Sequence, residues 1–480
     1  MREFVTERLF AFAEKNPAKT AIVDPVCSVT YGELAAMVYG VAGALRSLGL
    51  GAGDAVLVEA VPRAEYAMLV YGIHLAGCVN VPVENRVPAD RLREIAERVG
   101  AKLILAGSDP GCGVRTLRIA DMISLALPYA EQWTPGTSLS YPDPALRGEI
   151  LFTTGSTGRS KGVCQTRAAV SSYLEAMNTA LSMHEGTVLL VVTPLNHAGG
   201  LHRMHMTLHC GGTLVLLDGM TDLRAFYDAI DRYSVNTLYL PPSGVHILLL
   251  LSAKKLAALD GRLDFVFTAS APFPQGDREK MRALLPNTRL IEAYGGSEVG
   301  SVCCCNYNDP GYIPGCMGKP YPCVELRIED ELISIRSPML MEGYLDDPEL
   351  TEKVLRDGWF RTSDRGRLDE EGRLFFLGRS DDVINVGGKK VAPSELEEVV
   401  LTLPGVADCA VMPVEDAAAG TVLCLLVVQK PGTEFSPREL IAALRGKVED
   451  YKIPYFIREI HAVPRFPNGK IDRKRLSSAQ

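Results

Sequence analysis

The segment FTTGSTGRSKG, residues 152–162, concentrates glycines, hydroxyl side chains and a lysine in one loop. Gly155 and Gly158 can adopt positive φ, which lets consecutive backbone amides point toward one anion. The loop does not fit the P-loop pattern, because Ser160 stands where the second glycine of that pattern is required. The segment therefore predicts a phosphate-binding loop of another kind, and a flexible surface turn is the alternative.

Four further segments carry residues suited to the same chemistry. They are EAYGGSEVG at 292–300, GWFRTSDRG at 358–366, FLGRSDDVINVGGKKVAPSELE at 376–397 and PRFPNGKIDRKRL at 464–476. Glu298 offers the hard oxygen that Mg²⁺ prefers, and Asp364 can accept hydrogen bonds from two neighbouring hydroxyls of a ribose. The ammonium of Lys470 can stabilise negative charge that gathers in a transition state. Taken singly, each of these side chains is more often a solvated surface residue.

In this order and at these separations, the five segments together resemble the ATP-dependent adenylate-forming family. This family includes acyl- and aryl-CoA ligases, the adenylation domains of peptide synthetases and firefly luciferase. The resemblance covers essentially the whole chain, from TYGELAAMV near its start to Lys470. It implies that the carboxylate of an acid attacks the α-phosphate of ATP, giving an acyl-adenylate and pyrophosphate, before the acyl group passes to a thiol.

The resemblance also implies the residues of the nucleotide site. They are Thr153, Thr154, Gly155, Ser156, Thr157, Gly158, Lys161, Ser270, Ala271, Pro272, Glu292, Ala293, Tyr294, Gly295, Asp364 and Arg379. In this set Lys161 is a mobile charge for the β- and γ-phosphates, Asp364 and Arg379 contact the ribose, and Tyr294 stacks on adenine unless it is an ordinary core tyrosine.

Three further residues are implied for the first half-reaction. Glu298 binds Mg²⁺, and Ser297 directs its hydroxyl to the α-phosphate in a position where the family usually has threonine. Lys470 is matched to the catalytic lysine, which bridges the substrate carboxylate and the α-phosphate.

The second half-reaction is implied to need a rotation of a small C-terminal domain about a hinge at Asp381. After this rotation Gly387 and Gly388 leave room for the pantetheine arm of CoA, although the same glycines also suit a hairpin turn.

The segment TPLNHAGGL, residues 193–201, bears on the acid. It has no aspartate to pair with an amino group, so it resembles the corresponding segment of CoA ligases. This resemblance implies that His197 gates the acyl pocket. The alternative is that His197 is a histidine packed in the core. Small residues at Gly199, Gly200, Gly295 and Gly296 are expected to leave volume for an aromatic or medium-size acid. His202, Arg203 and His205 could supply a cation for a second carboxylate, although such residues on a helix more often face outward.

Apolar runs alternate with amphipathic helical stretches over most of the chain, which predicts α/β architecture with parallel, helix-covered sheets. From about Glu331 shorter alternating strands predict a barrel-like part. The pattern of the last hundred residues predicts a small α+β domain, and the resemblance implies that this domain is mobile. We expect domains at 1–380 and 381–480.

The net charge of −8, with 50 Lys and Arg interspersed among 58 Asp and Glu, argues against nucleic acid or an anionic membrane as a partner. No apolar run is long enough to span a bilayer, and no signal peptide is recognised, so a cytoplasmic enzyme with twelve reduced cysteines is expected. The expected partners are a small carboxylic acid, ATP with Mg²⁺, and CoA, with a homodimer also considered. A stand-alone adenylation enzyme that loads a carrier-protein phosphopantetheine is the alternative function.

Overall fold

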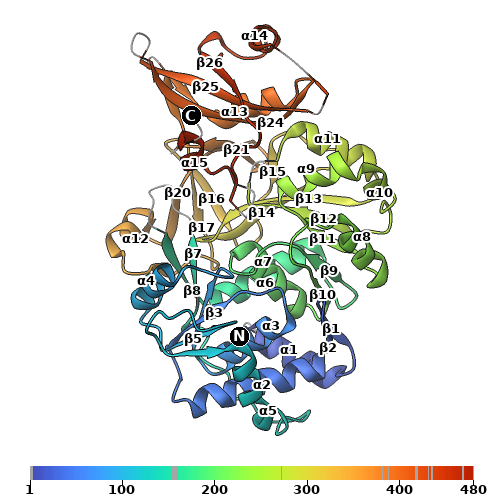
Figure 1. Cartoon of the computed structure of the whole chain (residues 1–480), viewed down its shortest axis with the longest axis vertical. Coiled ribbons are helices and arrows are strands. Elements are labelled where there is room, and N and C mark those ends of the chain that lie inside the picture. The colour runs from blue at the N-terminus through green and yellow to red at the C-terminus, as the bar shows by residue number, and fades with distance from the viewer. Residues whose placement is uncertain are drawn as a thin grey trace.

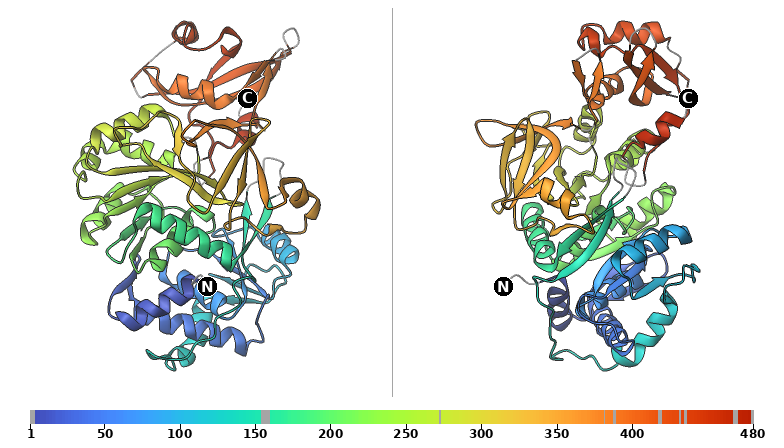
Figure 2. Two further views of the ribbon diagram at one scale, coloured as in Figure 1. Left: turned by 180° about the vertical axis from the view of Figure 1, so that it is seen from behind. Right: turned by 90° about the vertical axis from the view of Figure 1, so that its left-hand side faces the viewer.

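The computed structural model of the chain describes residues 4–153, 160–271, 273–380, 382–386, 389–416, 420–430, 432–433, 436–466 and 470–478. Helix-covered sheets form most of the molecule, and a smaller group of elements from the C-terminal end lies at the top of Figure 1. Figure 2 shows from two further directions that this group stands at one end of the molecule. None of the described helices has the length and apolar composition that a membrane span requires.

The first large sheet has eight strands, and all of its inner pairs are parallel, as the apolar runs predict. In spatial order the strands are β14 (Gly300–Asn306), β13 (Arg289–Gly296), β12 (Phe265–Thr268), β11 (Thr237–Tyr239), β9 (Val188–Val191), β10 (Thr213–Leu216), β1 (Thr20–Val23) and β2 (Ser28–Thr30). Because the carboxyl ends of parallel strands meet at one edge, the segments that follow β9, β11, β12 and β13 gather there.

The second large sheet has seven strands and a parallel centre. In spatial order they are β18 (Gly343–Tyr344), β8 (Lys161–Thr166), β7 (Arg147–Thr153), β4 (Val79–Val83), β3 (Ala55–Glu59), β5 (Leu103–Ala106) and β6 (Thr116–Arg118). The strands β7 and β8 are antiparallel, and Thr153 pairs with Lys161 at the end of this hairpin.

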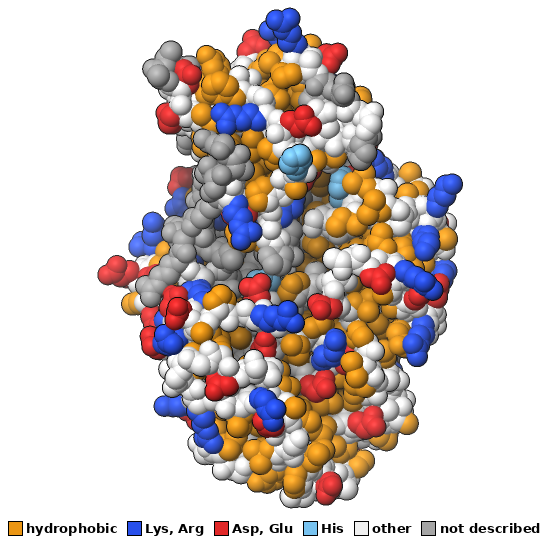
Figure 3. All heavy atoms as spheres, in the orientation of Figure 1, with side chains coloured by type: hydrophobic (Ala, Val, Ile, Leu, Met, Phe, Trp, Pro, Cys, Tyr) orange, Lys and Arg blue, Asp and Glu red, His pale blue; other side chains and the backbone are white. Residues whose placement is uncertain are grey.

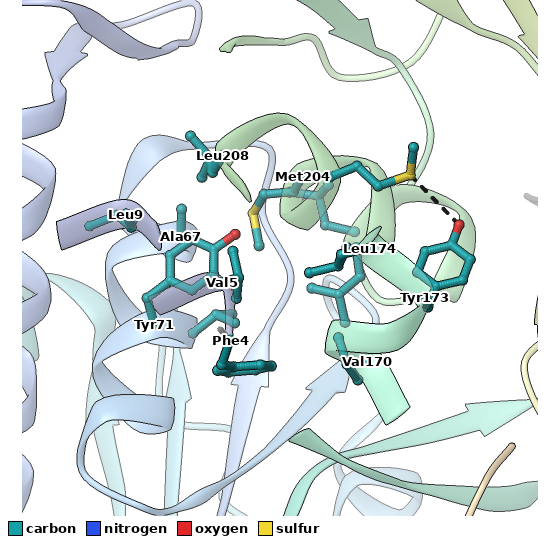
Figure 4. Close-up of a cluster of buried hydrophobic side chains, with 14 of the residues drawn as sticks. Phe4, Val5, Leu9, Ala67, Tyr71, Val170, Tyr173, Leu174, Met204 and Leu208 are labelled. Carbon is teal, nitrogen blue, oxygen red and sulfur yellow. Dashed lines mark hydrogen bonds between the residues drawn. The ribbon is translucent and has the colours of Figure 1, made fainter. Parts of the chain in front are cut away.

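Four helices build the core between the two sheets. They are α1 (Val5–Lys15), α3 (Ala64–Leu75), α6 (Arg167–Leu181) and α7 (Ala198–His209). Figure 4 shows how apolar side chains of these helices pack together, among them Leu9, Tyr71, Leu174 and Met204. Burial of this apolar surface is the main contribution to the stability of the large sheets.

Two further helices, α2 (Tyr31–Ser47) and α5 (Ile119–Ala130), pack against each other and contribute to the same core. The other helices cover the outer faces of the sheets. They are α4 (Ala89–Val99) on the second sheet, and α8 (Leu223–Arg232), α9 (Pro242–Leu251), α10 (Ala253–Ala257) and α11 (Gln275–Leu284) on the first. Local signals in the sequence explain where several of them begin. Thr30 and Glu33 form a reciprocal capping box at α2, and the Asp222 side chain caps α8.

The part expected to be barrel-like is an open antiparallel sheet. Its strands are β15 (Cys316–Gly318), β21 (Leu374–Arg379), β20 (Trp359–Leu368), β17 (Leu332–Arg336) and β16 (Glu325–Glu329), with β19 (Leu355–Arg356) paired to β20 and α12 (Pro348–Val354) beside it. Among the described residues the two edge strands, β15 and β16, are not paired with each other, so the sheet does not close into a barrel.

The C-terminal elements have an apolar core of their own, which forms between a strand pair and two helices. The elements are β22 (Ile384–Val386), β23 (Lys389–Val391), α13 (Pro393–Leu401), β24 (Val406–Asp416), β25 (Gly420–Gln429), α14 (Pro437–Leu444), the 3₁₀ turn Asp450–Lys452, β26 (Phe456–Glu459) and α15 (Arg473–Ser478). The expected boundary at residues 380 and 381 stays a prediction, because Asp381 lies outside the described residues.

A buried polar cluster interrupts the apolar core. The Glu149 carboxylate on β7 lies 2.8 Å from Nε2 of His205 and 3.4 Å from Nε2 of His74, and the Tyr71 hydroxyl is hydrogen-bonded to His205 Nδ1 at 2.9 Å. Burial alone would raise the pKa of Glu149, but His205 and His74 hold it well below the usual carboxylate range. Burial lowers the pKa of His74 to about 4 and that of His202 to about 3. These two imidazoles are therefore neutral in the core.

The twelve cysteines all lie among the described residues, where no disulfide joins any of them, and most are buried. On the face shown in Figure 3, Lys and Arg side chains are interspersed with Asp and Glu side chains.

Candidate active site

Two strands of the antiparallel sheet carry the residues predicted to contact a ribose. Asp364 on β20 pairs with Arg379 on β21, and Arg379 Nε lies 3.6 Å from Asp364 Oδ1. The Tyr294 hydroxyl, from the end of β13, donates to Asp364 Oδ2 at 2.7 Å. Burial raises the pKa of Asp364, against the opposing effects of Tyr294 and Arg379. Three side chains predicted from separate motifs thus meet at one point.

The predicted phosphate loop connects β7 to β8. Thr153 and Lys161 stand at its two ends, whereas Thr154, Gly155, Ser156, Thr157 and Gly158 lie outside the described residues. Lys161 Nζ is 5.2 Å from the ring centre of Tyr344, and the hydroxyl of Tyr344 donates to Glu298 Oε1 at 2.9 Å. The lysine and the carboxylate therefore face the same tyrosine, although 137 positions separate them in the numbering of the chain.

The backbone around Ser297 and Glu298 is fixed by neighbouring strands. The Gln165 side-chain amide donates to the Ser297 carbonyl at 2.9 Å, and the Met341 amide donates to the Glu298 carbonyl at 2.8 Å. Both side chains are half-buried, so they retain access to the solvent. This backbone support leaves the Ser297 hydroxyl and the second carboxylate oxygen of Glu298 available for a ligand.

Lys470 belongs to the C-terminal elements but acts electrostatically on this site. Desolvation by the surrounding protein, followed by the positive charge of Arg379, lowers the pKa of Lys470, while Glu298 and Asp364 oppose this shift. The pKa of His197, at the N-terminus of α7, is lowered by burial and then by Lys470. The lysine therefore lies within electrostatic reach of residues from three predicted motifs. We call Lys161, Glu298, Tyr344, Asp364, Arg379 and Lys470 the nucleotide side.

The loop after β12 contains Ser270 and Ala271, and Pro272 lies outside the described residues. Ser270 has φ of +83°, which is unusual for a residue other than glycine, and its Oγ is 3.0 Å from the Tyr239 hydroxyl. A Cβ added to Gly199 would lie 2.7 Å from the same hydroxyl. We call His197, Gly199, Arg203, Tyr239 and Ser270 the acyl side.

Two expectations about open volume are corrected by the structure. A Cβ on Gly200 would lie 2.3 Å from the Pro194 carbonyl oxygen, and a Cβ on Gly295 would lie 2.0 Å from the Gly300 carbonyl oxygen. Backbone fills these positions, so neither glycine opens a pocket; both allow a close approach of two chain segments. Gly296 is different, because the nearest atom to its added Cβ is the flexible Glu298 carboxylate at 3.5 Å.

Glu292 and Ala293 are both buried in β13. Both carboxylate oxygens of Glu292 accept hydrogen bonds from Arg278 on α11, at 2.8 and 2.9 Å. This pair occupies the whole Glu292 side chain, so only its backbone remains for a nucleotide.

His202, Arg203 and His205 do not face outward, as helical residues of this kind more often do. All three are buried, with His205 in contact with Glu149 and Arg203 between aromatic rings. A separate cavity of about 360 Å³ is lined by residues that include Asn196, Pro241 and Gly244.

Sequence reasoning missed Tyr344, Gln165 and Tyr239. Each acts through one hydrogen bond to a motif residue that is distant in the sequence. No motif carries them, and only the chain fold brings them to the site. The predicted residues Asp381, Gly387 and Gly388 lie outside the described residues.

Comparison with known proteins agrees with this geometry. The model of the AMP-binding enzyme family matches residues 9–345, and that of the AMP-binding enzyme C-terminal domain matches residues 395–470. The chain belongs to the AMP-binding enzymes. The resemblance inferred from the five segments is thereby confirmed.

Two curated relatives of this AMP-binding enzyme match nearly end to end. A 3-[(3aS,4S,7aS)-7a-methyl-1,5-dioxo-octahydro-1H-inden-4-yl]propanoyl:CoA ligase of Mycobacterium tuberculosis is 31% identical over 96% of both chains. The fatty acid–[acyl-carrier-protein] ligase ScoC of Streptomyces coeruleorubidus is 27% identical over 97% of this chain and 94% of its own. Acid–thiol ligation is common to both.

Crystal structures of MatB from Rhodopseudomonas palustris, 25% identical, cover this whole chain and 99% of their own. The TM-score is 0.89 with the ATP-bound form and 0.79 with the apo form. The overall arrangement of the AMP-binding enzyme described here is thus more similar to the ATP-bound form than to the apo form.

Proposed function

We propose that this enzyme is a carboxylic acid–CoA ligase that converts an aromatic or medium-size acid into its acyl-CoA thioester through an acyl-adenylate. The observation that carries the proposal is the placement of Lys470 within electrostatic reach of Glu298, Asp364, Arg379 and His197. A cation near these groups supports the proposal, because in the first half-reaction negative charge gathers on the carboxylate and the α-phosphate.

In the proposed first step a carboxylate oxygen of the acid bonds to the α-phosphorus of ATP, and the bond to the pyrophosphate oxygen breaks. The ammonium of Lys470 and the Ser297 hydroxyl stabilise the charge on the α-phosphoryl oxygens. Asp364 accepts hydrogen bonds from the ribose hydroxyls, and Lys161 attracts the departing pyrophosphate. Tyr294 positions Asp364 through its hydroxyl and offers its ring to the adenine.

The fit of Mg²⁺ to the site rests on Glu298. No group of three or more acidic, histidine or cysteine side chains among the described residues could enclose a metal ion. A single half-buried carboxylate with one free oxygen suits Mg²⁺, which keeps water ligands and shares phosphate oxygens with its protein site. Mg²⁺ held by Glu298 would neutralise phosphate charge there.

In the proposed second step the thiol sulfur of CoA attacks the acyl carbon, the bond to AMP breaks, and the thiol proton is released. The cavity lined by Asn196, Pro241 and Gly244 is the proposed route for the thiol, because Asn196 directly precedes His197 in the chain. The roles of Asp381 as a hinge and of Gly387 and Gly388 beside the pantetheine arm stay predictions. A homodimer stays a prediction as well.

The proposal is tested by measuring pyrophosphate release with ATP, Mg²⁺ and a panel of aromatic, short-chain and medium-chain acids, with and without CoA. Acid-dependent release, together with an acyl-CoA product on chromatography, is the expected result. Absence of pyrophosphate release with every acid would contradict the proposal.

Transfer to a carrier protein is a second candidate, because the curated relatives include a ligase that acts on an acyl-carrier protein. Acyl-adenylate is offered to equal concentrations of CoA and of a holo-carrier protein in parallel reactions. Faster thioester formation on CoA supports the proposal, and faster formation on the carrier favours the second candidate.

A further inference from the structure

Arg203 is a buried cation, and no acidic side chain of the described residues forms an ion pair with it. Its side chain lies on α7, and the residue is 6% exposed. One guanidinium nitrogen, Nη2, donates to the Tyr173 hydroxyl, whereas Nε and Nη1 have no hydrogen-bond partner among the described residues. Within the same residues no carboxylate lies within ion-pair distance of Arg203. Such a group is costly in a protein core unless a counter-charge reaches it.

Aromatic rings enclose this guanidinium. Its central carbon is 4.6 Å from the ring centre of Phe267, 4.9 Å from that of Tyr239 and 5.8 Å from that of Tyr173. The faces of aromatic rings attract a cation, but they do not satisfy its N–H groups. The rings thus hold the guanidinium in position, and Nε and Nη1 stay without an acceptor among the described residues.

The position of Arg203 on the helix directs it toward the acyl side. Gly199 lies four residues earlier on the same face of α7, and helical side chains lean toward the helix N-terminus. Tyr239 connects the two residues, because its ring packs on Arg203 while its hydroxyl lies beside Gly199 and Ser270. Arg203 therefore stands at the inner end of the acyl side.

We propose that the acid activated by this enzyme carries a second carboxylate, which binds the free N–H groups of Arg203. The inference rests on the proposed ligase function and names its substrate class, a dicarboxylic acid. A neutral acceptor such as a ketone would satisfy the donors but would leave the buried positive charge without a counter-charge. A second carboxylate supplies both the hydrogen bonds and the charge.

The first test compares substrates on the unmodified enzyme. Dicarboxylic acids from succinate to sebacate, and terephthalate, are each paired with the monocarboxylic acid of the same length, the monomethyl ester and a keto acid. We expect kcat/KM for pyrophosphate release to favour the diacid of at least one length by about 10-fold or more, as for a hydrogen bond to a charged group. The keto acid distinguishes a carboxylate from a neutral acceptor.

The second test replaces the residue. Arg203→Met, which removes the charge and keeps the volume, should lower kcat/KM for the preferred diacid by about 10- to 100-fold, chiefly through KM. It should lower kcat/KM for the monocarboxylic acids by a clearly smaller factor than kcat/KM for the diacid. Arg203→Lys should retain part of the diacid preference. Thr207→Val, also buried on α7, is the matched control and should change all acids by the same factor.

Each outcome bears on one of the two proposals. A preference for monocarboxylic or keto acids at every length, or an equal loss for all acids in Arg203→Met, would overturn the inference and leave the ligase function standing. If Arg203→Met does not fold, the substrate comparison and Arg203→Lys still decide. Failure of every acid to release pyrophosphate would instead refute the ligase proposal.

Discussion

The nucleotide side and the acyl side are constructed from the chain in different ways. The nucleotide side draws on residues from Lys161 to Lys470, which lie on three sheets and on the C-terminal elements. The acyl side comes from residues 197–270 alone, at one edge of the first sheet. The nucleotide side carries charges of both signs with access to solvent, whereas the acyl side is enclosed by aromatic rings around one cation.

This difference indicates that the two sides serve different functions, adenylation on one side and selection of the acid on the other. On the proposed function, adenylation chemistry is the same for every acid, so the nucleotide side would serve all acids alike. Selection of the acid needs a fixed shape, which the packed core of the large sheets provides. Substitutions on the nucleotide side should therefore affect all acids alike, and substitutions on the acyl side should change the choice of acid.

The largest effect is expected from Lys470→Ala. Loss of one charge partner of the transition state typically costs about 10²-fold, so acyl-adenylate formation should fall by this factor for every acid. Thioester formation from synthetic acyl-AMP should persist, as measured by chromatography. Lys447→Ala, an exposed lysine of the same C-terminal part, is the control and should change neither step. An equal loss in both half-reactions would contradict the separate roles.

A smaller and selective effect is expected from Gly199→Leu. The new side chain would collide with the Tyr239 hydroxyl and fill the acyl side, so kcat/KM for large acids should fall by about 10-fold or more, since each buried methylene is worth about 0.8 kcal/mol. KM for ATP and turnover of small acids should be retained. Gly276→Leu is the control, because a Cβ on Gly276 meets no atom within 4 Å. Loss of large and small acids to the same extent would refute the assignment of Gly199 to the acyl side.

Tyr344→Phe tests a residue that no motif predicts. The variant keeps the ring that faces Lys161 and removes the hydrogen bond to Glu298, which should cost about 1 kcal/mol, or about 5-fold in kcat/KM for ATP. The factor should be the same for all acids, measured by pyrophosphate release. A change in acid preference would show that the two sides are coupled.

The pH dependence of adenylation should report the ammonium of Lys470. Its pKa lies below the ordinary 10.5, so the charged form is lost at a lower pH than for a free lysine. As pH rises, kcat/KM for adenylation should therefore fall with a midpoint below 10.5, and this fall should be absent from thioester formation. In Lys470→Arg any remaining activity should persist to higher pH, because guanidinium stays protonated. An unchanged alkaline limb in that variant would assign the limb to another group.

The sequence predicted much of the fold because local signals and the global architecture agree. The apolar runs form the strands β9, β10 and β11, and capping residues stand where the helices α2 and α14 begin. The closed or open state of the antiparallel sheet could not be predicted, because it depends on pairing between strands distant in the sequence. The strands β15 and β16 show this, since each has a partner on one side only.

Some features of the site could likewise be predicted from the sequence, and others depend on the fold. Lys470, Glu298 and Asp364 come from separate motifs and lie within electrostatic reach of one another, and their roles stay predictions. Gly200 could not be interpreted correctly, since a glycine that opens a pocket and a glycine that admits neighbouring backbone look alike in sequence. The burial of Arg203 also depends on rings from α6, β11 and β12 that only the fold brings together.

The Glu149 cluster links folding of the large sheets to proton release. His74 and His202 have pKa values of about 4 and about 3 in the folded chain, far below the 6.5 of an exposed imidazole, so unfolding takes up protons in this interval. The stabilising contribution is present above about pH 6.5 and is lost as acid is added, and the low pKa of Glu149 acts in the same direction at lower pH. Acidification from about pH 7 to about pH 5 should lower the free energy of unfolding in urea, with a smaller slope in His202→Phe. The buried histidines thus make the lifetime of the folded ligase, and not only its catalytic rate, decrease in mildly acidic solution.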